Sequence, residues 1–333
     1  MLCVVTGANG FVGSNLCKAL IKKGHKVRGM VRVTSDLSSI EKLNIELING
    51  SLDDKESLKK AVANVDIVYH VAALANDWGS LKLYRRINVE GTKNILEASS
   101  VAKVKRFVYI SSIAVHSCYG RQDADENAPA EAVISSYCIS KRESESLVMD
   151  FYKKTGFPVT IVRPGDVFGP NDRTSFLRMA VPLKKGTLPY IDHGRTVLAY
   201  TYVENLVDGI MLAGENKNSI GQAYIITDGI KVTWKELYDA LVSELGFRKP
   251  LFSLNSRFAW LIAVVLETIY GTLGIKTRPI ATRYLINHLR YDFHFSIEKA
   301  KKELGYKPEI PFNEGIKRIA QWYKEYLKTV VGR

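Results

Sequence analysis

Three glycines spaced three residues apart follow an apolar opening segment, and they restrict the start of the chain to one kind of folding unit. Residues 2–6 read Leu-Cys-Val-Val-Thr, which is typical of a buried parallel strand. The glycines allow the backbone to turn sharply and to approach a phosphate before a helix begins, and the first N–H groups of that helix attract anions. The pattern therefore predicts a dinucleotide-binding strand, turn and helix. We expect cofactor contacts in this turn from Gly7, Asn9, Gly10, Phe11 and Val12.

The first 165 residues alternate between strand-like and helix-like segments. Short apolar runs recur along this part of the chain, and longer amphipathic runs separate them. Strands that alternate with helices form a parallel sheet with helices on both faces. The predicted fold class is therefore α/β, a Rossmann-type doubly wound parallel sheet. We expect strands over 25–31, 65–73, 106–112 and 158–163, and helices over 10–23, 88–98 and 137–152.

Beyond Pro164 the alternation becomes irregular, which predicts a second and smaller lobe. Residues 223–227 again read as an apolar strand that returns to the sheet. The predicted boundaries are 1–165 for a dinucleotide-binding domain, completed by a returning strand and helix near 201–227, and 166–200 with 228–333 for a discontinuous C-terminal substrate lobe.

The cysteines constrain the compartment and the metal chemistry. Cys3, Cys17, Cys118 and Cys138 show no paired spacing, so they suit a reducing compartment and exclude a cysteine-based zinc site. No basic segment precedes the first strand, so we expect no signal peptide. The sequence thus predicts a cytoplasmic protein that holds no metal.

The charge balance is basic, with 47 Lys and Arg against 34 Asp and Glu and a formal net charge of +13. Such a balance attracts nucleic acid, anionic lipid or a phosphorylated cofactor. No nucleic-acid-binding motif is recognisable, so no nucleic-acid partner is expected.

A tyrosine and a lysine supply the chemistry that the glycine turn lacks. Tyr137 and Lys141 are four residues apart in a helical pattern, so both side chains leave the same helix face. A free tyrosine has a pKa of about 10, and we expect the neighbouring ammonium to lower it. Tyr137 can then exchange a proton with a substrate hydroxyl or carbonyl, while Lys141 also binds the ribose of a nicotinamide cofactor. Ser112, with Ser111 in reserve, ends the strand before this helix and can hydrogen-bond the same substrate oxygen.

The end of the second predicted strand indicates which cofactor binds. Enzymes that use NAD usually carry an acidic residue about 20 positions beyond the glycines, where it binds the adenosine ribose. This chain has Arg32 near that position, and its guanidinium can bind the 2′-phosphate of NADP. NADP is therefore expected, with NAD as the alternative if Asp36 folds back toward the ribose.

With these motifs in place, the chain resembles the extended short-chain dehydrogenase/reductases of the NAD(P)-dependent epimerase/dehydratase superfamily. The resemblance covers nearly the whole length. It depends on segments 6–13, 70–73, 88–92, 111–112, 137–141 and 163–165.

The resemblance implies further roles around the cofactor. In the family, the segment that matches 70–73 places its backbone along the cofactor, and the asparagine that matches Asn88 supports the active-site helix. His70 reads equally as a core histidine that contributes only its backbone. The family usually has an aspartate where this chain has Ser51 and Leu52, at the adenine end. The implied cofactor contacts are Ser51, Leu52, Val71, Ala72, Ala73, Asn88, Pro164, Gly165 and Val167, with Tyr137 and Lys141.

Later segments favour one branch of the superfamily. Segments 200–206 and 221–228 resemble the 3β-hydroxysteroid dehydrogenase/isomerase branch, and so does the serine pair followed by isoleucine at 111–113. Nucleotide-sugar epimerases commonly carry asparagine where this chain has Asp166, and a carboxylate there repels a sugar pyrophosphate. They also carry an Arg-Asp pair where this chain has Leu198 and Ala199.

The resulting functional prediction is an NAD(P)-dependent oxidoreductase with Tyr137 as general acid/base. It interconverts a secondary alcohol and a ketone on a small apolar substrate that is steroid-, isoprenoid- or lipid-like. The alternatives are a nucleotide-sugar epimerase/dehydratase, a dihydroflavonol-type ketone reductase and a cofactor-sensing regulator. A regulator is expected to lose Tyr137 or Lys141, and this chain keeps both.

One apolar segment has two competing interpretations. Residues 258–266 are all uncharged and mostly large, which is too short a run to span a membrane. They form either a core helix or an exposed helix that meets a lipid substrate or a membrane. Basic residues follow at 276, 278, 283 and 290, so peripheral contact with an anionic membrane through 258–275 is one expectation. By analogy with the family, we also expect a homodimer through the helices that begin near Leu83 and Tyr137.

Overall fold

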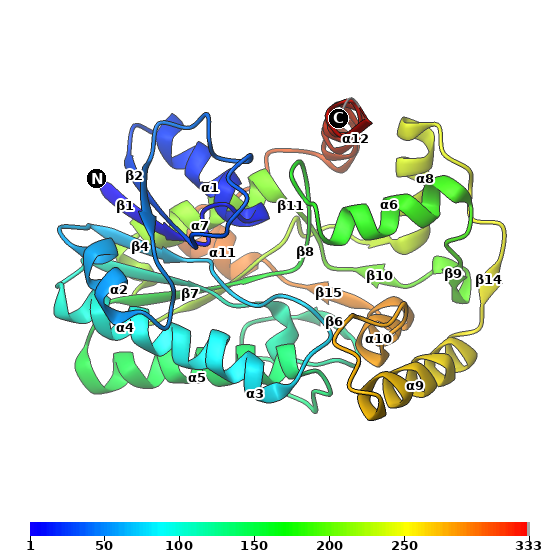
Figure 1. The fold of residues 1–333 in the computed structure, drawn as a ribbon, viewed down its shortest axis with the longest axis horizontal. Coiled ribbons are helices and arrows are strands. Elements are labelled where there is room, and N and C mark those ends of the chain that lie inside the picture. The colour runs from blue at the N-terminus through cyan, green and yellow to red at the C-terminus, as the bar shows by residue number, and fades with distance from the viewer. Residues whose placement is uncertain (332–333) are drawn as a thin grey trace.

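The computed structural model describes residues 1–331, and within them seven parallel strands form the central sheet (Figure 1). The spatial order is β12-β7-β5-β4-β1-β2-β3, so the direction of winding reverses between β1 and β4. This arrangement confirms the predicted doubly wound parallel sheet. The strands are β1 (Leu2–Thr6), β2 (Lys26–Val31), β3 (Glu46–Asn49), β4 (Ile67–His70), β5 (Arg106–Ile110), β7 (Val159–Pro164) and β12 (Ala223–Ile226).

Helices cover both faces of the sheet, because each strand alternates apolar side chains above and below it. One face carries α1 (Phe11–Lys22), α7 (Val203–Glu215) and α11 (Glu298–Leu304) over a core of mostly aliphatic side chains. The other face carries α2 (Lys55–Val62), α4 (Gly91–Val101) and α5 (Ser136–Thr155) over a second core. In Figure 1 these two helical layers lie above and below the strands.

The helix expected over 88–98 begins earlier than its sequence pattern indicated. It starts with α3 (Leu81–Tyr84), capped by the Ser80 side chain, and passes through a π-helical segment, η1 (Arg85–Glu90), before it continues as α4. A π-helical turn inserts one extra residue and rotates the side chains around it, and such turns often occur at functional sites. Here the segment includes Asn88.

The remainder of the chain forms short strand pairs and helices beside the carboxyl edge of the sheet. Helices α6 (Ser175–Lys185), α8 (Trp234–Leu245) and α12 (Phe312–Val331) enclose a core rich in aromatic side chains. The predicted substrate lobe extended to residue 333, and its last two positions lie outside the described residues. The strand pairs are β8 (Asp166–Phe168) with β11 (Tyr200–Tyr202), β10 (Val197–Leu198) with β13 (Val232–Thr233), β9 (Tyr190–Ile191) with β14 (Ser253–Leu254), and β6 (Arg121–Ala124) with β15 (Phe293–Phe295).

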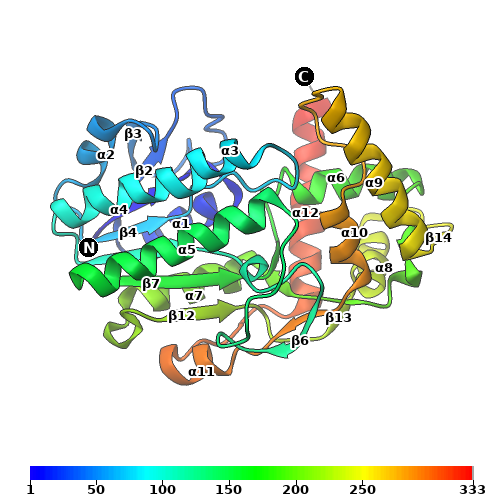
Figure 2. The ribbon, with the colours of Figure 1, turned by 90° about the horizontal axis from the view of Figure 1, so that it is seen from below.

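The apolar segment near residue 260 forms helix α9 (Ser256–Thr272), which lies beside α10 (Arg283–Arg290) (Figure 2). Only Ala259 and Ala263 of α9 are buried, so the interpretation of this segment as a core helix is wrong. No helix within residues 1–331 is long and apolar enough to cross a membrane.

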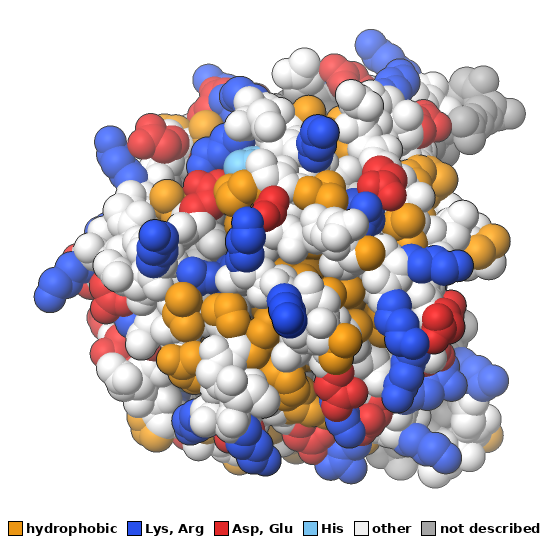
Figure 3. All heavy atoms as spheres, turned by 90° about the vertical axis from the view of Figure 1, so that its left-hand side faces the viewer, with side chains coloured by type: hydrophobic (Ala, Val, Ile, Leu, Met, Phe, Trp, Pro, Cys, Tyr) orange, Lys and Arg blue, Asp and Glu red, His pale blue; other side chains and the backbone are white. Residues whose placement is uncertain are grey.

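On the face drawn in Figure 3, the basic side chains do not form one continuous patch. Lysine and arginine side chains are scattered there, with acidic and hydrophobic side chains between them. Many of the cations in residues 1–331 form ion pairs with carboxylates, and these pairs reduce the local field.

Candidate active site

The opening glycine turn lies between β1 and α1 at the carboxyl edge of the sheet. Gly7 has a φ of +65°, and a Cβ there would lie 3.0 Å from the Cα of Ala72. A Cβ on Gly13 would lie 2.2 Å from the Gly7 carbonyl oxygen, so α1 begins directly against the turn. The turn occupies the point where the sheet reverses its winding, which is where folds of this class bind dinucleotides.

The start of α1 is suited to an anion. Gly10 caps the helix without a side-chain hydrogen bond, and the first turn contains no acidic residue. The N–H groups of Phe11 and Val12 at this end therefore face no competing side-chain acceptor, and the helix dipole favours negative charge there. These features fit the diphosphate of a dinucleotide.

A buried histidine fixes the segment that faces the turn. Thr6 Oγ1 accepts hydrogen bonds from the backbone N–H groups of Val71 and Ala72, each at 3.1 Å, so its proton is donated to His70 Nδ1 at 2.8 Å. His70 Nε2 then donates to Thr92 Oγ1 at 2.9 Å. Burial, with a contribution from Lys141, lowers the pKa of His70 to about 3, so this ring is neutral. His70 is therefore a structural residue that holds Val71 and Ala72 against the turn, with Ala73 following.

Asn88 joins the segment after β4 to the helix that carries Tyr137. Its Oδ1 accepts from the Leu74 N–H at 2.7 Å, and its Nδ2 donates to the Leu74 carbonyl at 3.2 Å and to Ser140 Oγ at 2.9 Å. Ser140 in turn donates to the Tyr137 carbonyl at 2.8 Å. Asn88 thus supports the first turn of α5, which is the role implied by the resemblance.

Arg32 lies exposed at the end of β2, beyond the glycine turn. Its backbone N–H donates to Ser35 Oγ at 3.1 Å. No side-chain hydrogen bond or ion pair of Arg32 is present within residues 1–331, so its guanidinium is available to a ligand.

Asp36, the alternative residue for NAD, is held in a different direction. Its backbone carbonyl accepts from Asn9 Nδ2 at 3.2 Å, so the loop does fold back onto the turn. Its carboxylate instead pairs with Arg173 Nη1 at 2.6 Å and accepts from the Ser38 N–H at 2.9 Å. Hydrogen bonds from Ser38 and, to a smaller extent, the charge of Arg173 lower the pKa of Asp36, so it stays ionised and engaged with the substrate lobe.

Ser51 and Leu52 follow β3 at the adenine end of the predicted site. The Ser51 hydroxyl donates to the Asp53 carboxylate, and the Leu52 carbonyl accepts from Asn94 Nδ2 at 2.8 Å. The Leu52 side chain covers Gly91, where a Cβ would lie only 2.9 Å from Leu52 Cδ1.

The two serines that end β5 have different partners. Ser111 Oγ donates to the Glu145 carboxylate at 2.6 Å and is buried. Ser112 Oγ accepts from the Ala114 N–H at 3.2 Å and lies near the Tyr137 phenol, whose pKa it lowers. Between the two candidates, the geometry favours Ser112 as the residue that meets a substrate oxygen.

Tyr137 and Lys141 share the face of α5 that looks toward β5. The Ser135 hydroxyl caps this helix by accepting from the Tyr137 N–H at 3.1 Å, which fixes the tyrosine on the first turn. Lys141 Nζ donates to the Ile110 carbonyl at 2.7 Å and lies 5.1 Å from the centre of the Tyr109 ring.

The expected lowering of the Tyr137 pKa is wrong for this arrangement. Burial raises the pKa of Tyr137 to about 12, against the effect of Ser112. Burial also lowers the pKa of Lys141 to about 7, against the effect of the Glu145 carboxylate. Desolvation dominates because Lys141 is buried and Tyr137 is half-buried, and it disfavours the charged form of each side chain. Tyr137 is consequently a neutral phenol at physiological pH, with a proton to donate.

Pro164, Gly165 and Val167 lie where β7 ends and β8 begins. A Cβ on Gly165 would lie 2.3 Å from the Ala199 carbonyl oxygen, so this turn requires glycine. Val167 is half-buried and packs against the same core that supports α1. The turn brings the backbone of these three residues to the carboxyl edge of the sheet, where the resemblance places the nicotinamide.

Asp166, within this turn, forms an ion pair with a residue that sequence reasoning missed. His288 Nε2 lies 2.7 Å from Asp166 Oδ1, and Asp166 Oδ2 accepts from the Ala199 N–H at 3.1 Å. Burial opposes a charge on His288, but Asp166 outweighs it and raises the pKa of this ring. Because His288 compensates Asp166, the repulsion that we expected against a pyrophosphate is weaker than the sequence suggested.

The wall beside Tyr137 is aromatic and apolar. The Tyr84 ring meets the Tyr137 ring edge-on at 6.5 Å. Tyr284 from α10 packs against Tyr137 together with Cys118 and Cys138, whose Sγ atoms lie 3.5 Å apart. Cys138 is fully buried.

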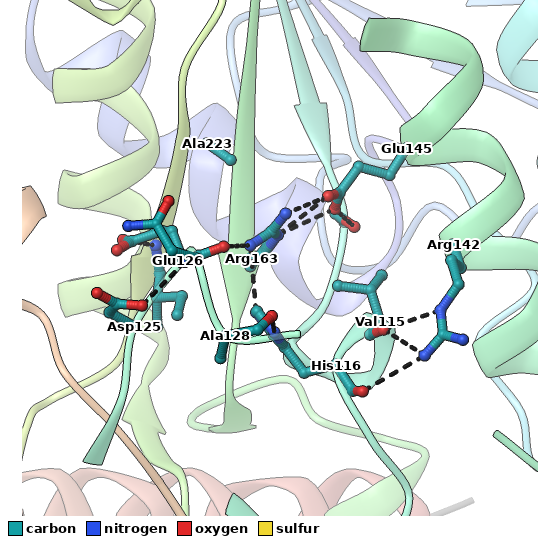
Figure 4. A network of polar contacts seen from close by, with 12 residues as sticks. Val115, His116, Asp125, Glu126, Ala128, Arg142, Glu145, Arg163 and Ala223 are labelled. Carbon is teal, nitrogen blue, oxygen red and sulfur yellow. Dashed lines mark hydrogen bonds and ion pairs between the residues drawn. The ribbon is translucent and has the colours of Figure 1, made fainter. Parts of the chain in front are cut away.

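A network of polar contacts behind Ser112 fixes its loop to α5 and β7 (Figure 4). Arg163 Nε donates to both oxygens of Glu145, at 3.1 and 3.2 Å, and Arg163 Nη1 donates to His116 Nε2 at 3.1 Å. Arg142 Nη2 donates to the Val115 carbonyl at 2.7 Å. Burial and the charge of Arg163 lower the pKa of His116 to about 4, so His116 is a neutral acceptor.

The structure thus gathers the predicted residues at one edge of the sheet and adds several others. Glu145 follows Lys141 by four residues, a spacing in the sequence that already places both side chains on one face of the helix. His288 and Tyr284 are separated from Asp166 by more than a hundred positions, and no local pattern indicated them. Within residues 1–331, no group of three or more His, Cys, Asp or Glu side chains is arranged to hold a metal ion.

Comparison with known proteins agrees with this geometry. A family model described as the NAD dependent epimerase/dehydratase family matches residues 3–227. A 3-beta-hydroxysteroid dehydrogenase of Mycolicibacterium neoaurum is 30% identical over 346 residues, which cover 99% of this chain and 93% of its own. A 2-alkyl-3-oxoalkanoate reductase of Stenotrophomonas maltophilia (strain K279a) is 29% identical over 328 residues, 96% of this chain and 98% of its own. The crystal structure of gox2253 is 33% identical, with a TM-score of 0.83 over 98% of both chains.

Proposed function

The chain belongs to the NAD dependent epimerase/dehydratase family of extended short-chain dehydrogenase/reductases, and on this basis we propose that it is a ketone reductase with an apolar substrate. The proposal depends chiefly on Tyr137, a half-buried neutral phenol beside Ser112 at the edge of the sheet where the glycine turn lies. This arrangement offers two hydroxyl groups to one substrate oxygen. Secondary alcohol and ketone are then interconverted, with reduction favoured near neutral pH.

The proton chemistry follows from the protonation states of the residues. Ser112 donates a hydrogen bond that polarises the substrate carbonyl, and Tyr137 donates the proton that the developing alkoxide requires. When Lys141 is protonated, its ammonium, one turn further along α5, stabilises the tyrosinate that remains. Oxidation of the alcohol uses the same residues in reverse and requires an ionised Tyr137, so it is favoured at alkaline pH.

The chain holds its cofactor through the glycine turn and the strand ends around it. When bound, the reduced nicotinamide supplies a hydride to the carbonyl carbon. The N–H groups of Phe11 and Val12 would bind the diphosphate, and Pro164 and Gly165 would border the nicotinamide. We further propose NADP in preference to NAD, because Arg32 is free to bind a 2′-phosphate whereas the Asp36 carboxylate is engaged by Arg173.

The surroundings of Tyr137 support an apolar substrate. The wall consists of Tyr84, Tyr284 and buried thiols. Around the site, the guanidinium groups of Arg163, Arg173 and Arg278 each pair with a carboxylate, which leaves them poorly suited to binding a sugar pyrophosphate. The names of the two relatives, a steroid dehydrogenase and a reductase of alkyl oxoalkanoates, point to the same class.

A substrate screen tests this function. Oxidation of NADPH and NADH is followed by the loss of absorbance of the reduced nicotinamide, with a long-chain 3-oxo acid, a 3-ketosteroid, a dihydroflavonol and a UDP-sugar. We expect turnover with an apolar ketone and none in a Tyr137→Phe variant. Epimerisation of the UDP-sugar without activity on any apolar ketone would contradict the proposal. Cofactor binding without turnover of any compound, unchanged by the variant, would favour a cofactor-sensing regulator.

We also propose that the chain forms a homodimer. Helices α4 and α5 form an exposed groove lined by Leu147 and Phe151, with Lys93, Glu97 and Glu143 at its rim. A two-fold axis through this groove would bury the apolar pair and let charges of opposite sign meet. Leu147→Glu should convert the dimer into a monomer in light-scattering measurements, whereas an unchanged mass would exclude this face.

A further inference from the structure

Helix α9 exposes a stripe of large apolar side chains. Phe258, Leu261, Val265, Ile269 and Leu273 are between 45% and 69% exposed. Successive members are three or four residues apart, so all five project from one side of the helix. The opposite side packs on α10 through the small residues Ala259 and Ala263.

Further exposed apolar side chains lie in the segments that flank the helix. Leu251 and Phe252, which precede it, are 80% and 49% exposed, and Ile280, which follows it, is 85% exposed. The segment 251–280 thus contains half of the exposed large hydrophobic side chains in the described part of the chain. A concentration of exposed apolar side chains of this kind usually binds another protein, a ligand or a membrane.

The charges around the stripe are almost all positive. Arg248 and Lys249 precede Leu251, Arg257 precedes Phe258, and Lys276 follows Leu273. The one carboxylate in segment 248–280, that of Glu267, accepts from Arg283 Nε at 2.6 Å and from the Arg283 N–H at 2.7 Å. Arg283 of α10 therefore compensates the charge of Glu267. The stripe on α9 remains apolar, with cationic residues at both ends.

A second copy of the chain is a poor occupant for this surface. The 17-residue helix is about 25 Å long and about 10 Å wide, so it offers roughly 250 Å² to a partner. A stable protein interface buries about 800 Å² on each side. Any two-fold pairing of the stripe would also bring cationic ends together, whether the helices ran parallel or antiparallel.

We propose that α9 docks on the surface of an anionic lipid bilayer and inserts its apolar stripe among the acyl chains without crossing. The helix has the length, the apolar face and the flanking cations of an interfacial helix. Each cation near an anionic surface strengthens binding by about fivefold. This inference goes beyond the proposed reaction and does not depend on it.

The segment that follows α9 is joined by hydrogen bonds and an ion pair to the loop beside Tyr137. Arg278 pairs with Asp77 in the loop that follows Ala73, and Thr282 Oγ1 donates to the same carboxylate at 2.6 Å. Trp78 Nε1 donates to the Ile275 carbonyl at 3.2 Å, and Ser136, beside Tyr137, donates to the Gly79 carbonyl at 3.1 Å. A bound membrane would therefore lie next to the loop over Tyr137, where an apolar substrate can enter from lipid.

Vesicle partitioning tests the proposal with the full chain. Co-sedimentation is measured with phosphatidylcholine vesicles and with vesicles that also contain phosphatidylglycerol. Leu261→Asp and Val265→Asp place a charge on the stripe, and Val101→Asp is the matched control, because Val101 is 82% exposed at the end of α4. The double variant Arg257→Gln/Lys276→Gln removes the flanking charges, and sodium chloride is varied as an independent test of electrostatics.

We expect the wild type and Val101→Asp to bind anionic vesicles equally well and each stripe variant to bind at least tenfold more weakly. The charge variant should lose affinity for anionic vesicles but not for phosphatidylcholine. Activity on a water-soluble ketone and the melting temperature should be unchanged in Leu261→Asp, so a failed docking test is distinct from a failed assignment of the reaction. Absence of vesicle binding by the wild type, or equal losses in Val101→Asp and Leu261→Asp, would overturn the proposal. So would a change of oligomeric mass in Leu261→Asp without a change in lipid binding, which would assign the stripe to a second copy.

Discussion

Asp166 accepts a hydrogen bond from His288 Nε2 at 2.7 Å, and this contact joins the turn after β7 to helix α10. The His288 ring is enclosed between Tyr284 and Phe293, with ring centres 5.9 and 4.6 Å away. The ion pair is therefore shielded from solvent, and it connects the wall beside Tyr137 to the edge of the sheet. Its strength should depend on the charge of the imidazole.

Asp166→Asn should destabilise the protein most at mildly acidic pH. Asp166 raises the pKa of His288 above its ordinary value of 6.5, despite burial. The stabilisation from a raised pKa is complete below the unfolded value and is lost as pH rises through the folded value. The difference in melting temperature between wild type and variant should thus be largest near pH 6 and smaller near pH 9. A difference that is constant across this range would show that His288 does not change its charge between pH 6 and pH 9, against the prediction.

Tyr137→Phe should lower turnover by about 10²–10⁴ and leave cofactor affinity nearly unchanged. Phenylalanine keeps the ring that packs against Tyr84 and Tyr284 and removes only the proton donor. Steady-state kinetics and fluorescence titration with NADPH measure the two quantities. Near-normal turnover in the variant would exclude Tyr137 as the acid.

Lys141→Met should abolish most activity but raise stability in acid. Burial lowers the pKa of Lys141 to about 7, so below that pH the buried ammonium destabilises the folded protein. This penalty is fully present below pH 7 and disappears as pH rises toward the unfolded value of 10.5. The variant should melt at least about 2 °C higher than wild type at pH 6, a shift of roughly 1 kcal/mol for a chain of this size. A variant that melts lower at pH 6 would mean that contacts of the ammonium outweigh its desolvation.

Arg32→Ala should weaken NADP binding by about tenfold to a hundredfold, the loss of a charge-assisted contact of roughly 1.5–3 kcal/mol. NAD binding should change little, because NAD carries no 2′-phosphate. Lys42→Ala, another exposed cation in the same region of the chain, is the control. A wild-type preference for NAD, or equal loss of both cofactors, would show that Arg32 does not select between them.

Gly13→Ala should reduce both cofactor affinity and stability, because its Cβ would lie 2.2 Å from the Gly7 carbonyl oxygen. Overpacking of this kind costs about 1–3 kcal/mol. Gly271→Ala in α9 meets no atom within 4 Å and should instead stabilise the helix by up to about 0.5–1 kcal/mol. Thermal melts of the two variants, with and without NADPH, distinguish a loss of folding stability from a loss of cofactor binding at the glycine turn.

The parts of the fold predictable from sequence were those with strong local patterns. The buried strands β1, β5 and β7 consist mostly of apolar residues, and α5 ends at a glycine. Strand β3 was not predicted, because Glu46–Asn49 is largely exposed at the sheet edge and lacks an apolar run. The ends of α3 and η1 were missed because a π-helical turn breaks the 3.6-residue period.

The candidate site divides in the same way. Motif spacing placed Gly7, Tyr137 and Lys141 at one edge of the sheet, since parallel strands bring their carboxyl ends together. The expected shift of the Tyr137 pKa was wrong because spacing alone carries no information about burial. The partner of Asp166 depends on how α10 packs, which is a tertiary relationship with no trace in local sequence.

Strands β7 and β12 are hydrogen-bonded neighbours, yet residues 165–222 separate them in the chain. This connection has a consequence for the order of assembly. During synthesis, β7 presents an unpaired edge until the intervening segment has emerged and closed a long loop, which costs entropy before any contact compensates it. Lys299 of α11 donates to the Ala223 carbonyl of β12 at 3.1 Å. Strand β12 therefore gains this contact only after residues near 299 have been synthesised. Nascent chains truncated before α11 should consequently remain aggregation-prone and dependent on chaperones.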